Sequence, residues 1–580
     1  DVINMKRRSC NNNLNILITL GMALGAATII GLSKKNDKKN TTCSCTRINL
    51  YENKENKQVY FVGGGLASLA GAAYLIRDCN FKGENIHIIE GLRILGGSND
   101  GAGNNEEGFV CRGGRMLNEE TYENFWELFS TIPSLEMPGK SVTEEILNFD
   151  HLHPTHAQAR LVDRYGVILD VKSMGFNNAD RLALGKLMAT KEEDLDDITI
   201  EEWFINTPHF FKTNFWYMWQ TTFAFQKWSS VFELKRYMNR MIFEFSRIET
   251  LEGVTRTPYN QYESVILPLK KYLENCNVDF SINATVTDID FKPGREITAT
   301  AIHIKDKEGE KIITLNSGDV CIMTNGCMTD NARLGDFDNP AEYDIEKPIS
   351  AELWEKVSKK KPGLGNPKPF FGYPEQTNWE SFTVTCKGNK LLKLIEKFSM
   401  NIPGSGALMT FKDSNWLMSI VVAAQPHFKN QSMDTTIFWG YGLYTDKEGN
   451  YIKKPMRDCT GEEILIELLH HLHLDSKKDE IIEDVINVIP CMMPYIVSQF
   501  QPHKISDRPK VVPCGSTNFA MISQFVEIPE DMVFTEEYSV RAARIAVYKL
   551  FNVKHKKICP VTPYNKDPKV LLNALKTSFR

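Results

Sequence analysis

The most informative pattern of hydrophobic and polar residues begins at Val59–Val62. This short apolar run is followed by the glycines 63–65 and then by small residues up to Ala73. A buried strand, a tight turn and a close-packed helix give this order, and the apolar run 85–90 predicts a neighbouring strand. The pattern therefore predicts the α/β class, with a Rossmann-like parallel sheet that begins near residue 57.

The glycine turn has the composition of a dinucleotide-binding loop. Gly63 allows a sharp turn, Gly65 allows a pyrophosphate to approach the backbone, and Ser68 is small enough for helix and strand to pack closely. Glu90 ends the second strand, where it is placed to accept a ribose hydroxyl. An acid followed by Arg93 and paired glycines is closer to the FAD site of flavoproteins with two dinucleotide-binding domains than to an NAD site. We expect FAD, the alternative being an ordinary strand–turn–helix.

Other segments are expected to approach the same cofactor. They are the glycine- and arginine-rich run after residue 108, the small polar residues after the buried strand 319–323, and the loop and strand near residue 516. The predicted cofactor-binding residues are Gly63, Gly65, Leu66, Ala67, Ser68, Glu90, Gly97, Ser98, Arg112, Gly113, Gly114, Arg115, Thr324, Asn325, Ser516, Thr517 and Asn518.

The N-terminal segment Leu14 to Leu32 is nearly all apolar and has lysines or arginines on both sides. Its length is about that needed to span a bilayer. We expect an uncleaved membrane anchor, with a removable signal peptide as the alternative. The basic flanks favour a cytoplasmic catalytic part, and residues 33–56 have the composition of a polar tether.

Residues 181–260 combine a helical pattern with many aromatic rings, which suits either an elongated apolar pocket or a helical core. Tyr237 lies beside Arg236 and Arg240, so we expect a phenol held near cations, which favours proton donation. A core tyrosine with a hydrogen-bonded hydroxyl is the alternative. His427, in a later region of alternating strands, is a candidate for binding a carboxylate or a structural histidine.

At 580 residues the chain is too long for one hydrophobic core. A net charge of −5 gives no reason to expect nucleic acid. The thirteen cysteines include no CxxC pair, so neither a zinc site nor a disulfide scaffold is predicted, and no metal is expected. The expected parts are an anchor and tether (1–56), three pieces of an FAD-binding domain (57–180, 261–335 and 506–555), a helical aromatic-rich substrate segment (181–260), a mixed α+β substrate domain (336–505) and an amphipathic tail for a membrane surface or a neighbouring subunit (556–580).

In this order the motifs resemble those of the oleate hydratases, once called myosin-cross-reactive antigens. The resemblance runs from about Lys57 to Arg580 and rests on Gly63–Ser68, Glu84–Glu90, Arg112–Arg115, Thr222–Phe225, Tyr259–Tyr262, Gln425–Phe428 and Ser516–Asn518. It implies an FAD enzyme, active with the reduced cofactor, that adds water across the cis-9 double bond of a free unsaturated fatty acid such as oleate. The product is a 10-hydroxy acid, without net redox. Family members are often dimers, so the resemblance extends to a homodimer, whereas the N-terminal anchor lies outside the family pattern.

The resemblance also implies roles for single residues. It places the acid that protonates the alkene at Tyr237. The glutamate expected after Arg-Gly-Gly-Arg is replaced by Met116, and a thioether cannot accept a proton. Asn118, Glu119, a backbone carbonyl or the flavin remain to place the water, so the predicted catalytic residues are Tyr237, Met116 and Asn118.

The fatty-acid carboxylate is expected at Gln425 and His427. The threonine and asparagine expected just before Gln425 are missing from the run 421–424, which is Val-Val-Ala-Ala.

Three classes of function stay open. The first is a hydratase. The second is a flavin-dependent fatty-acid double-bond isomerase or desaturase-like oxidoreductase, which the missing glutamate or a net turnover of flavin would favour. The third is a catalytically silent flavin- and lipid-binding protein at a membrane.

Overall fold

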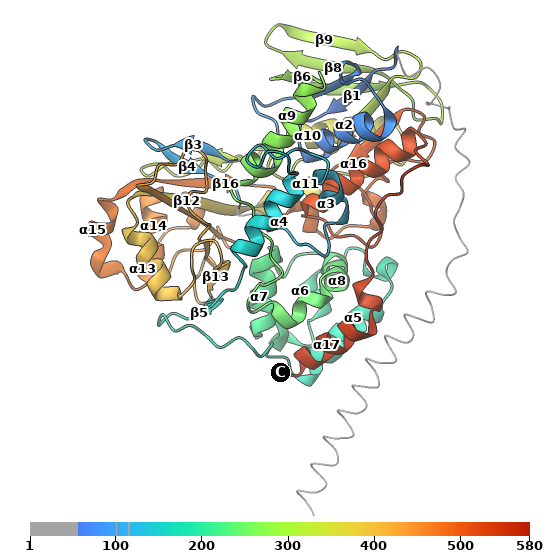
Figure 1. The fold of residues 1–580 in the computed structure, drawn as a ribbon. Helices are drawn as coiled ribbons and strands as arrows, with labels where there is room; N and C mark the ends of the chain where they lie inside the picture. The colour runs from blue at the N-terminus through green and yellow to red at the C-terminus, as the bar shows by residue number, and fades with distance from the viewer. Residues whose placement is uncertain (1–55, 100, 114–115) are drawn as a thin grey trace, which may run out of the picture.

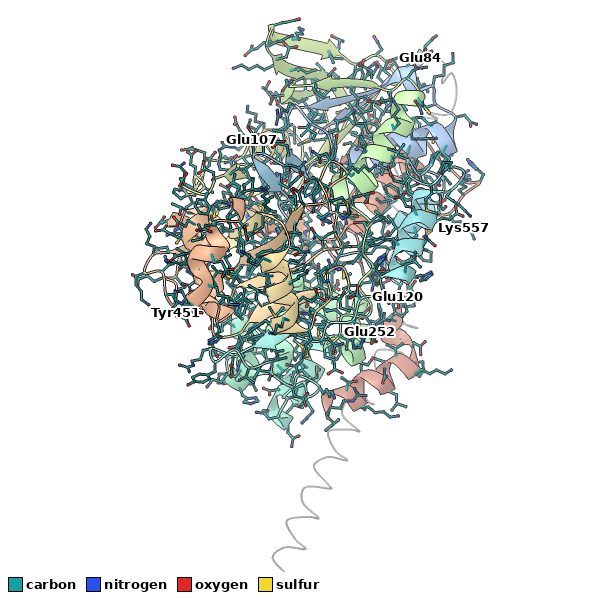
Figure 2. All side chains as sticks on the ribbon, turned by 60° about the vertical axis from the view of Figure 1, so that its left-hand side comes forward. Glu84, Glu107, Glu120, Glu252, Tyr451 and Lys557 are labelled. Atoms are coloured by element: carbon teal, nitrogen blue, oxygen red, sulfur yellow. The ribbon has the colours of Figure 1, made fainter. Side chains whose placement is uncertain are left out.

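The computed structural model describes residues 56–99, 101–113 and 116–580. It has a parallel sheet, a mainly antiparallel sheet and a group of helices, which lie at the top, left and bottom of Figure 1. Figure 2 shows that Glu84, beside the first sheet, and Tyr451, in the second lobe, lie far apart. The predicted anchor, the tether up to residue 55, Gly114 and Arg115 lie outside the described residues. Among the helices described, none combines the length and apolar character needed to cross a membrane.

The first sheet is entirely parallel, and its strands come from three separate stretches of the chain. Its strand order is β17-β10-β1-β2-β6. The strands are β1 (Val59–Val62), β2 (Ile86–Glu90), β6 (Asp279–Ile282), β10 (Val320–Thr324) and β17 (Phe519–Ile522). The predicted α/β class with a Rossmann-like sheet is confirmed.

Small residues explain why the first helix packs so closely on this sheet. Helix α2 (Leu66–Cys79) lies between β1 and helix α16 (Glu536–Leu550). A Cβ placed on Gly71 would come within 2.6 Å of the Phe61 ring, and Ala543 of α16 lies 3.8 Å from the same point. The close packing fixes the N-terminus of α2 at the carboxyl edge of the sheet.

The second sheet has the order β11-β16-β12-β15-β14-β13-β5. Its strands are β5 (Leu161–Val162), β11 (Arg333–Leu334), β12 (Trp379–Lys387), β13 (Leu408–Phe411), β14 (Ser419–Val421), β15 (Thr435–Gly442) and β16 (Val485–Met493). Helices α13 (Lys390–Ser399) and α14 (Gly461–His471) pack on it, as does the hairpin of β3 (Ala102–Asn104) and β4 (Gly108–Val110).

Two edge strands of the second sheet come from segments that the sequence analysis assigned to another domain. β5 and β11 lie within segments assigned to the FAD-binding domain, yet both pair with the second sheet. Each is only two residues long. So short a segment has no periodicity of its own, and its partner is set by the tertiary fold.

The remaining elements surround the two sheets. β7 (Thr285–Phe291), β8 (Ala299–Asp306) and β9 (Gly309–Thr314) form an antiparallel sheet beside the first one, with α9 (Leu267–Asn275) and α10 (Ile349–Lys360) nearby. Helices α3 (Glu123–Phe129) and α4 (Val142–Leu152) lie near the centre, and the lower group holds α5 (Asn178–Ala189), α6 (Ile200–Trp203), α7 (Asn214–Phe223) and α8 (Val231–Arg240).

The C-terminal helix α17 (Pro568–Ser578) packs on its own chain. It contacts the 3-10 helix Ile242–Arg247 and lies beside α5 in Figure 1. Arg181 of α5 donates to the carbonyl of Ser578 at 2.8 Å, and its guanidinium lies 4.3 Å from the Phe579 ring centroid. The neighbouring helices thus cover part of this helix, while Leu572 stays exposed, and its binding to a membrane or a subunit stays a prediction.

Two fully buried glutamates, on the second sheet and on a helix packed against it, differ in how their carboxyl groups are hydrogen-bonded. Neither carboxyl oxygen of Glu380, on β12, has a hydrogen-bond partner among the described residues. Burial, and then Asp458, raise the pKa of Glu380 well above its usual value. Glu467, on α14, accepts the backbone N–H groups of Tyr451 and Ile452. Burial opposes ionisation there too, but His471 and these N–H groups hold the pKa of Glu467 below its usual value.

We expect Glu380→Gln to stabilise the protein increasingly as the pH rises from 5 to 8. A raised folded-state pKa means that the native state binds more protons than the unfolded state, so wild-type stability falls by about 1.4 kcal/mol per pH unit between the two pKa values. Glutamine removes this loss. Urea denaturation at several pH values measures it. Glu467→Gln is the control, and it should instead destabilise the protein; equal effects of the two variants would contradict this account.

Candidate active site

The carboxyl edge of the first sheet opens into a cavity of about 420 Å³. The residues that follow four of its strands line this cavity: 63–65 after β1, 91 and 92 after β2, 326–330 after β10 and 523–525 after β17. Ligands of open parallel sheets bind at this edge because the loops that leave adjacent strands diverge there. The second sheet, helices α7, α8 and α10, and the segment that follows α8 supply further parts of the wall.

The glycine loop has the geometry that a phosphate requires. Gly63 has φ +96°, and a Cβ on Gly97 would lie 3.1 Å from the Cα of Gly65. Gly65 caps α2 without a side-chain hydrogen bond, and the first turn holds no acid. The free N–H groups and the positive end of this helix therefore face the cavity beside Leu66 and Ala67. Ser68 does not line the cavity and is fully buried, as close helix–strand packing requires.

Glu90 lies where the sequence predicted it, at the end of β2 and in the cavity wall. Its carboxylate accepts the backbone N–H of Gly64 at 2.7 Å and of Leu92 at 2.8 Å. Burial raises the pKa of Glu90, and these two hydrogen bonds oppose the rise. The carboxylate is thus held at the turn, within reach of a sugar hydroxyl.

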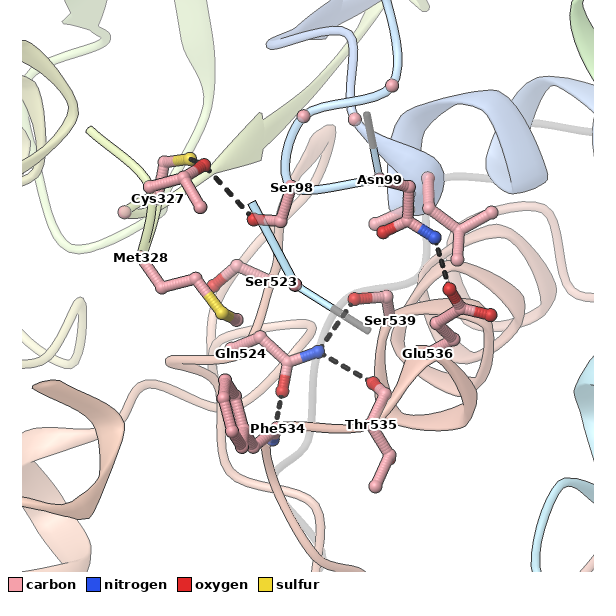
Figure 3. Close-up of a pocket in the computed structure, with 18 of the residues that line it drawn as sticks. Ser98, Asn99, Cys327, Met328, Ser523, Gln524, Phe534, Thr535, Glu536 and Ser539 are labelled. Carbon is pink, nitrogen blue, oxygen red and sulfur yellow. Dashed lines mark hydrogen bonds between the residues drawn. The ribbon is translucent and has the colours of Figure 1, made fainter. Parts of the chain in front are cut away.

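A second wall brings together residues that the sequence analysis missed (Figure 3). The Gln524 amide donates to the Thr535 carbonyl at 2.8 Å and to the Ser539 hydroxyl at 2.9 Å. Asn99 donates to Glu536 across the same wall. Gln524 follows the last parallel strand directly, and that position is the signal that would have identified it.

The structure does not bring residues 516–518 to the cavity. They precede β17 and lie at the amino end of the strand, whereas the cavity opens at the carboxyl end. Asn518 donates to the carbonyls of Ala299 and Asp319, both at 2.9 Å. The hydroxyl of Thr517 lies 2.7 Å from that of Thr298. These residues tie β17 to its neighbours, which differs from the expected cofactor contact.

Arg112 and Asn325 hold loops rather than line the cavity. Arg112 donates to the carbonyl of Gly97 at 2.7 Å. Asn325 donates to the carbonyl of Phe525 at 3.2 Å and accepts the Ser523 hydroxyl at 2.8 Å. Of the other predicted cofactor residues, Gly97, Ser98, Gly113 and Thr324 line the cavity, and Gly114 and Arg115 lie outside the described residues.

Tyr237 projects from α8 into the cavity wall and is 1% exposed. Its hydroxyl donates to the carbonyl of Val533 at 2.5 Å. Burial, followed by Tyr122, Glu233 and Asp531, raises the pKa of Tyr237 well above its usual value. The phenol is therefore fully protonated at neutral pH.

The two arginines beside Tyr237 do not act on it as free cations, which differs from the expectation. Arg236 forms ion pairs with Glu192 at 2.9 Å and with Glu527 at 2.6 Å. Arg240 likewise pairs with Glu123 and Asp531. Because the carboxylates neutralise both guanidiniums, burial determines the direction of the tyrosine pKa shift.

Most rings of the aromatic segment form a helical core. Phe204 stacks on Phe210 with centroids 3.8 Å apart, and Phe215 stacks on Trp219 at 5.1 Å. Among the eleven rings at 204, 210, 211, 215, 216, 217, 219, 223, 225, 228 and 232, only Phe223 lines the cavity. The apolar wall there comes instead from the second sheet, through Trp379, Leu408, Val421, Trp439 and Tyr441.

Met116 and Asn118 both line the cavity, while Glu119 is exposed and does not. The Asn118 amide donates to Glu244 at 2.9 Å and to the carbonyl of Gly253 at 3.0 Å. Glu244 also lines the cavity, and the sequence analysis missed it. Glu244 belongs to the 3-10 helix Ile242–Arg247, which follows the helix of Tyr237 in the chain.

A small pocket of about 30 Å³ adjoins the large cavity. Gly113, Val421 and Trp439 line both spaces. The small pocket also holds His427 and Arg256, and none of its described lining residues is acidic. Its volume suits about two water molecules or a group of similar size.

Arg256 supplies the charge of this small pocket. It is 7% exposed, and its Nε and Nη2 have no hydrogen-bond partner among the described residues. Burial lowers the pKa of Arg256 to about 10. Burial and the Arg256 charge also lower the pKa of His427 to about 4, so the imidazole is neutral at neutral pH. A buried cation without a hydrogen-bonded acid fits an anionic ligand.

Gln425 does not reach either space. Its amide nitrogen donates to the carbonyls of Ala423 and Ile437, both at 3.0 Å, and its oxygen accepts the Gln431 amide at 2.8 Å. These bonds occupy the side chain with its own loop and with strand β15. The predicted pair Gln425 and His427 is therefore separated, and Arg256 stands beside His427 instead.

A model of the MCRA family matches residues 56–548. A linoleate hydratase of Lactiplantibacillus plantarum is 40% identical over 559 residues, which cover 89% of this chain and 98% of that protein. An oleate hydratase of Streptococcus pyogenes serotype M49 (strain NZ131) is 39% identical over 517 residues, 86% of each chain. The family resemblance inferred from the motifs is confirmed.

Two solved structures are similar at low identity. A fatty acid isomerase from P. acnes, described as CLA-producing, has a TM-score of 0.46 and 13% identity, with 86% of this chain and 99% of that chain covered. A putative protoporphyrinogen oxidase from Exiguobacterium sp. 255-15 has the same TM-score and coverage and 14% identity.

We expect Arg256→Met to raise the free energy of unfolding of the ligand-free protein by about 1 kcal/mol or more, because an unpaired buried charge is removed. Urea denaturation measures the change. Arg160→Met is the matched control. Arg160 is also buried, but it donates to the Ile248 and Leu408 carbonyls and to Thr222, so its loss should destabilise the protein. A similar loss of stability in both variants would show that Arg256 is satisfied after all.

Proposed function

This chain belongs to the MCRA family, and we propose that it is a flavin-dependent hydratase of free unsaturated fatty acids. Relatives named linoleate hydratase and oleate hydratase support the reaction and the substrate class. The proposed product from oleate is the 10-hydroxy acid, formed without net redox. The structural observation that carries the proposal is the junction of a large, partly apolar cavity with a small pocket whose cation has no hydrogen-bonded acid.

FAD fits the residues at the sheet edge. The free N–H groups at the start of α2 and the close contact between the Gly65 and Gly97 backbones suit the pyrophosphate. Glu90 suits a ribose hydroxyl. When bound in its reduced form, flavin would supply a planar, electron-rich ring system able to stabilise nearby positive charge. We propose FAD as the cofactor on this fit.

The fatty acid would lie with its carboxylate in the small pocket. Arg256 offers two guanidinium nitrogens without a hydrogen-bond partner among the described residues, and neutral His427 offers a hydrogen-bonding ring. The large cavity shares Val421 and Trp439 with this pocket, and its wall also includes Leu408, Tyr441 and Tyr237. This arrangement neutralises the buried charge and removes the alkyl chain from water.

The reaction needs an acid and a positioned water. Tyr237 is protonated and lines the cavity, so it can give its proton to one alkene carbon. The water oxygen then bonds to the other carbon and releases a proton. The alkene gains H and OH, and no electrons are exchanged with the cofactor.

A fatty-acid double-bond isomerase is the second candidate, favoured by Met116 in the cavity wall. If no water captures the cation, loss of a neighbouring proton returns a displaced double bond. A silent flavin- and lipid-binding protein would give neither product. Membrane association, a cytoplasmic catalytic part and a homodimer stay predictions.

We expect the full-length chain, incubated anaerobically with FAD, a reductant and oleate in heavy-oxygen water, to form a labelled 10-hydroxy acid. Tyr237→Phe should lower the rate by about 100-fold or more, because a general acid contributes at least that factor. Mass spectrometry measures the product, and oleate binding by the variant is the control. An unlabelled, displaced alkene from the wild type would favour the isomerase, and an unchanged variant rate would remove Tyr237 as the acid.

Arg256→Met should raise the KM for oleate by about 10-fold to 100-fold, the value of one lost charge-assisted hydrogen bond, and leave kcat nearly unchanged. Steady-state kinetics measure both. Oleyl alcohol, which lacks the carboxylate, is the control ligand: its affinity should not fall. An unaltered KM for oleate would place the carboxylate elsewhere.

A further inference from the structure

We propose that Glu244 is a catalytic residue of this cavity, which orients the attacking water and accepts the proton that the water releases. The inference rests on the proposed hydration. Met116 cannot accept the proton, because a thioether is not a base. Asn118 instead holds the Glu244 carboxylate through a hydrogen bond.

Glu244 lies in the segment that directly follows the helix of Tyr237. Tyr237, Met241 and Glu244 all line the cavity, as do Ile248 and Leu251. Tyr237 belongs to α8, and Glu244 belongs to the 3-10 helix Ile242–Arg247 that follows it after Met241. The acid and the proposed proton acceptor therefore face the same cavity from two consecutive elements.

The other carboxylates of the cavity wall lie at the edge of the first sheet and hydrogen-bond to groups there. Both oxygens of Glu90 accept backbone N–H groups of the glycine turn. Asp330 accepts the Ser350 hydroxyl at 2.5 Å and follows β10. Glu536 accepts the Asn99 amide in the wall of Figure 3. These three lie with the loops proposed to hold the cofactor, whereas Glu244 accepts a hydrogen bond from Asn118, two residues after Met116.

The hydrogen bonds of Glu244 orient it and leave room for one more. Arg247 Nε donates to Oε2 at 2.7 Å, and Arg247 Nη2 donates to Oε1 at 2.7 Å. Asn118 donates to Oε1 at 2.9 Å. A carboxylate has about four lone-pair positions, so these three bonds leave one on Oε2 for a water.

The surrounding backbone is shaped for this carboxylate. A Cβ on Gly253 would meet Glu244 Oε1 at 2.0 Å, so any larger residue would displace it. The side-chain oxygen of Asn118 accepts hydrogen bonds from the backbone N–H and the hydroxyl of Thr121, both at 2.9 Å. This fixes the amide so that its nitrogen faces Glu244.

The electrostatic environment keeps Glu244 basic enough for the role. Burial raises the pKa of Glu244, and Arg247 opposes the rise. The charged groups that face it are Arg247 on its own helix and Glu120 from the segment after Asn118. Glu120 shares Arg247 at 2.6 Å and so weakens the pull of that cation on Glu244.

The proton balance closes without any redox step. Tyr237 gives a proton to one alkene carbon as the π bond breaks, and the water oxygen forms the new C–O bond. The water gives one proton to Glu244. That proton returns through solvent to the Tyr237 phenolate, so both residues regain their starting states and the product has gained one water.

The test compares Glu244→Gln with Glu120→Gln in the full-length, FAD-loaded protein. Both variants remove one carboxylate from Arg247, but only Glu244 lines the cavity. With oleate in deuterated water, we expect Glu244→Gln to lower hydroxy-acid formation by about 100-fold or more. Deuterium exchange into recovered alkene, which needs only the acid, should fall less than about tenfold. Glu120→Gln should stay within about threefold of wild type, the range of an exposed ion pair.

The pH profile gives a readout that a purely structural role would not move. In the wild type kcat should fall at low pH as Glu244 is protonated, and this limb should vanish in Glu244→Gln. Glu244→Asp, which keeps a carboxylate, should retain the limb at a reduced rate, and it serves if the glutamine variant does not fold.

Two results would overturn the role. Equal losses of hydration and exchange in Glu244→Gln, or an unchanged hydration rate, would show that Glu244 is only structural. A wild type that forms no hydroxy acid would instead contradict the proposed function itself.

Discussion

A buried network of ion pairs fastens the helical segment to the parallel sheet, and the placement of the whole site depends on it. Arg240 of α8 and Arg541 of α16 share Glu123 and Asp531, with contacts of 2.6 to 3.1 Å. The four residues come from three distant parts of the chain, since Asp531 and Arg541 lie only ten residues apart. Removing one partner of such a pair strands a buried charge, at a cost of about 3–5 kcal/mol. The network therefore fixes α8, which carries Tyr237 and leads into the 3-10 helix that carries Glu244.

The same network explains why charges near the site behave differently from one another. Arg236 and Arg240 are neutralised by carboxylates, so they do not polarise Tyr237. Arg256 has no such partner on two of its nitrogens, and it lies where the cavity narrows. The free positive end of α2 lies at the sheet edge of the same cavity. Cationic character is thus concentrated where a phosphate and a carboxylate would bind, with apolar walls between.

Both sheets contribute residues to the wall of the cavity. The parallel sheet supplies the glycine turn and the loops after its strands, while the second sheet supplies apolar side chains such as Trp379 and Trp439. Helix α8 closes the space between them. An elongated amphiphile matches this division, because its charged end, its chain and its reactive centre meet three different structural elements.

The sequence alone determined the parallel sheet, the glycine turn and the position of Glu90, because adjacent residues create those features through local periodicity and backbone freedom. It also identified Tyr237 and Met116 as residues of the site, through motif order. Only the tertiary structure decided that Ser516–Asn518 lie at the wrong end of their strand, that Gln425 is hydrogen-bonded to its own loop and to β15, and that Arg256 and Glu244 face the cavities. Those outcomes depend on which distant groups satisfy a buried charge or amide, and no local pattern encodes that partnership.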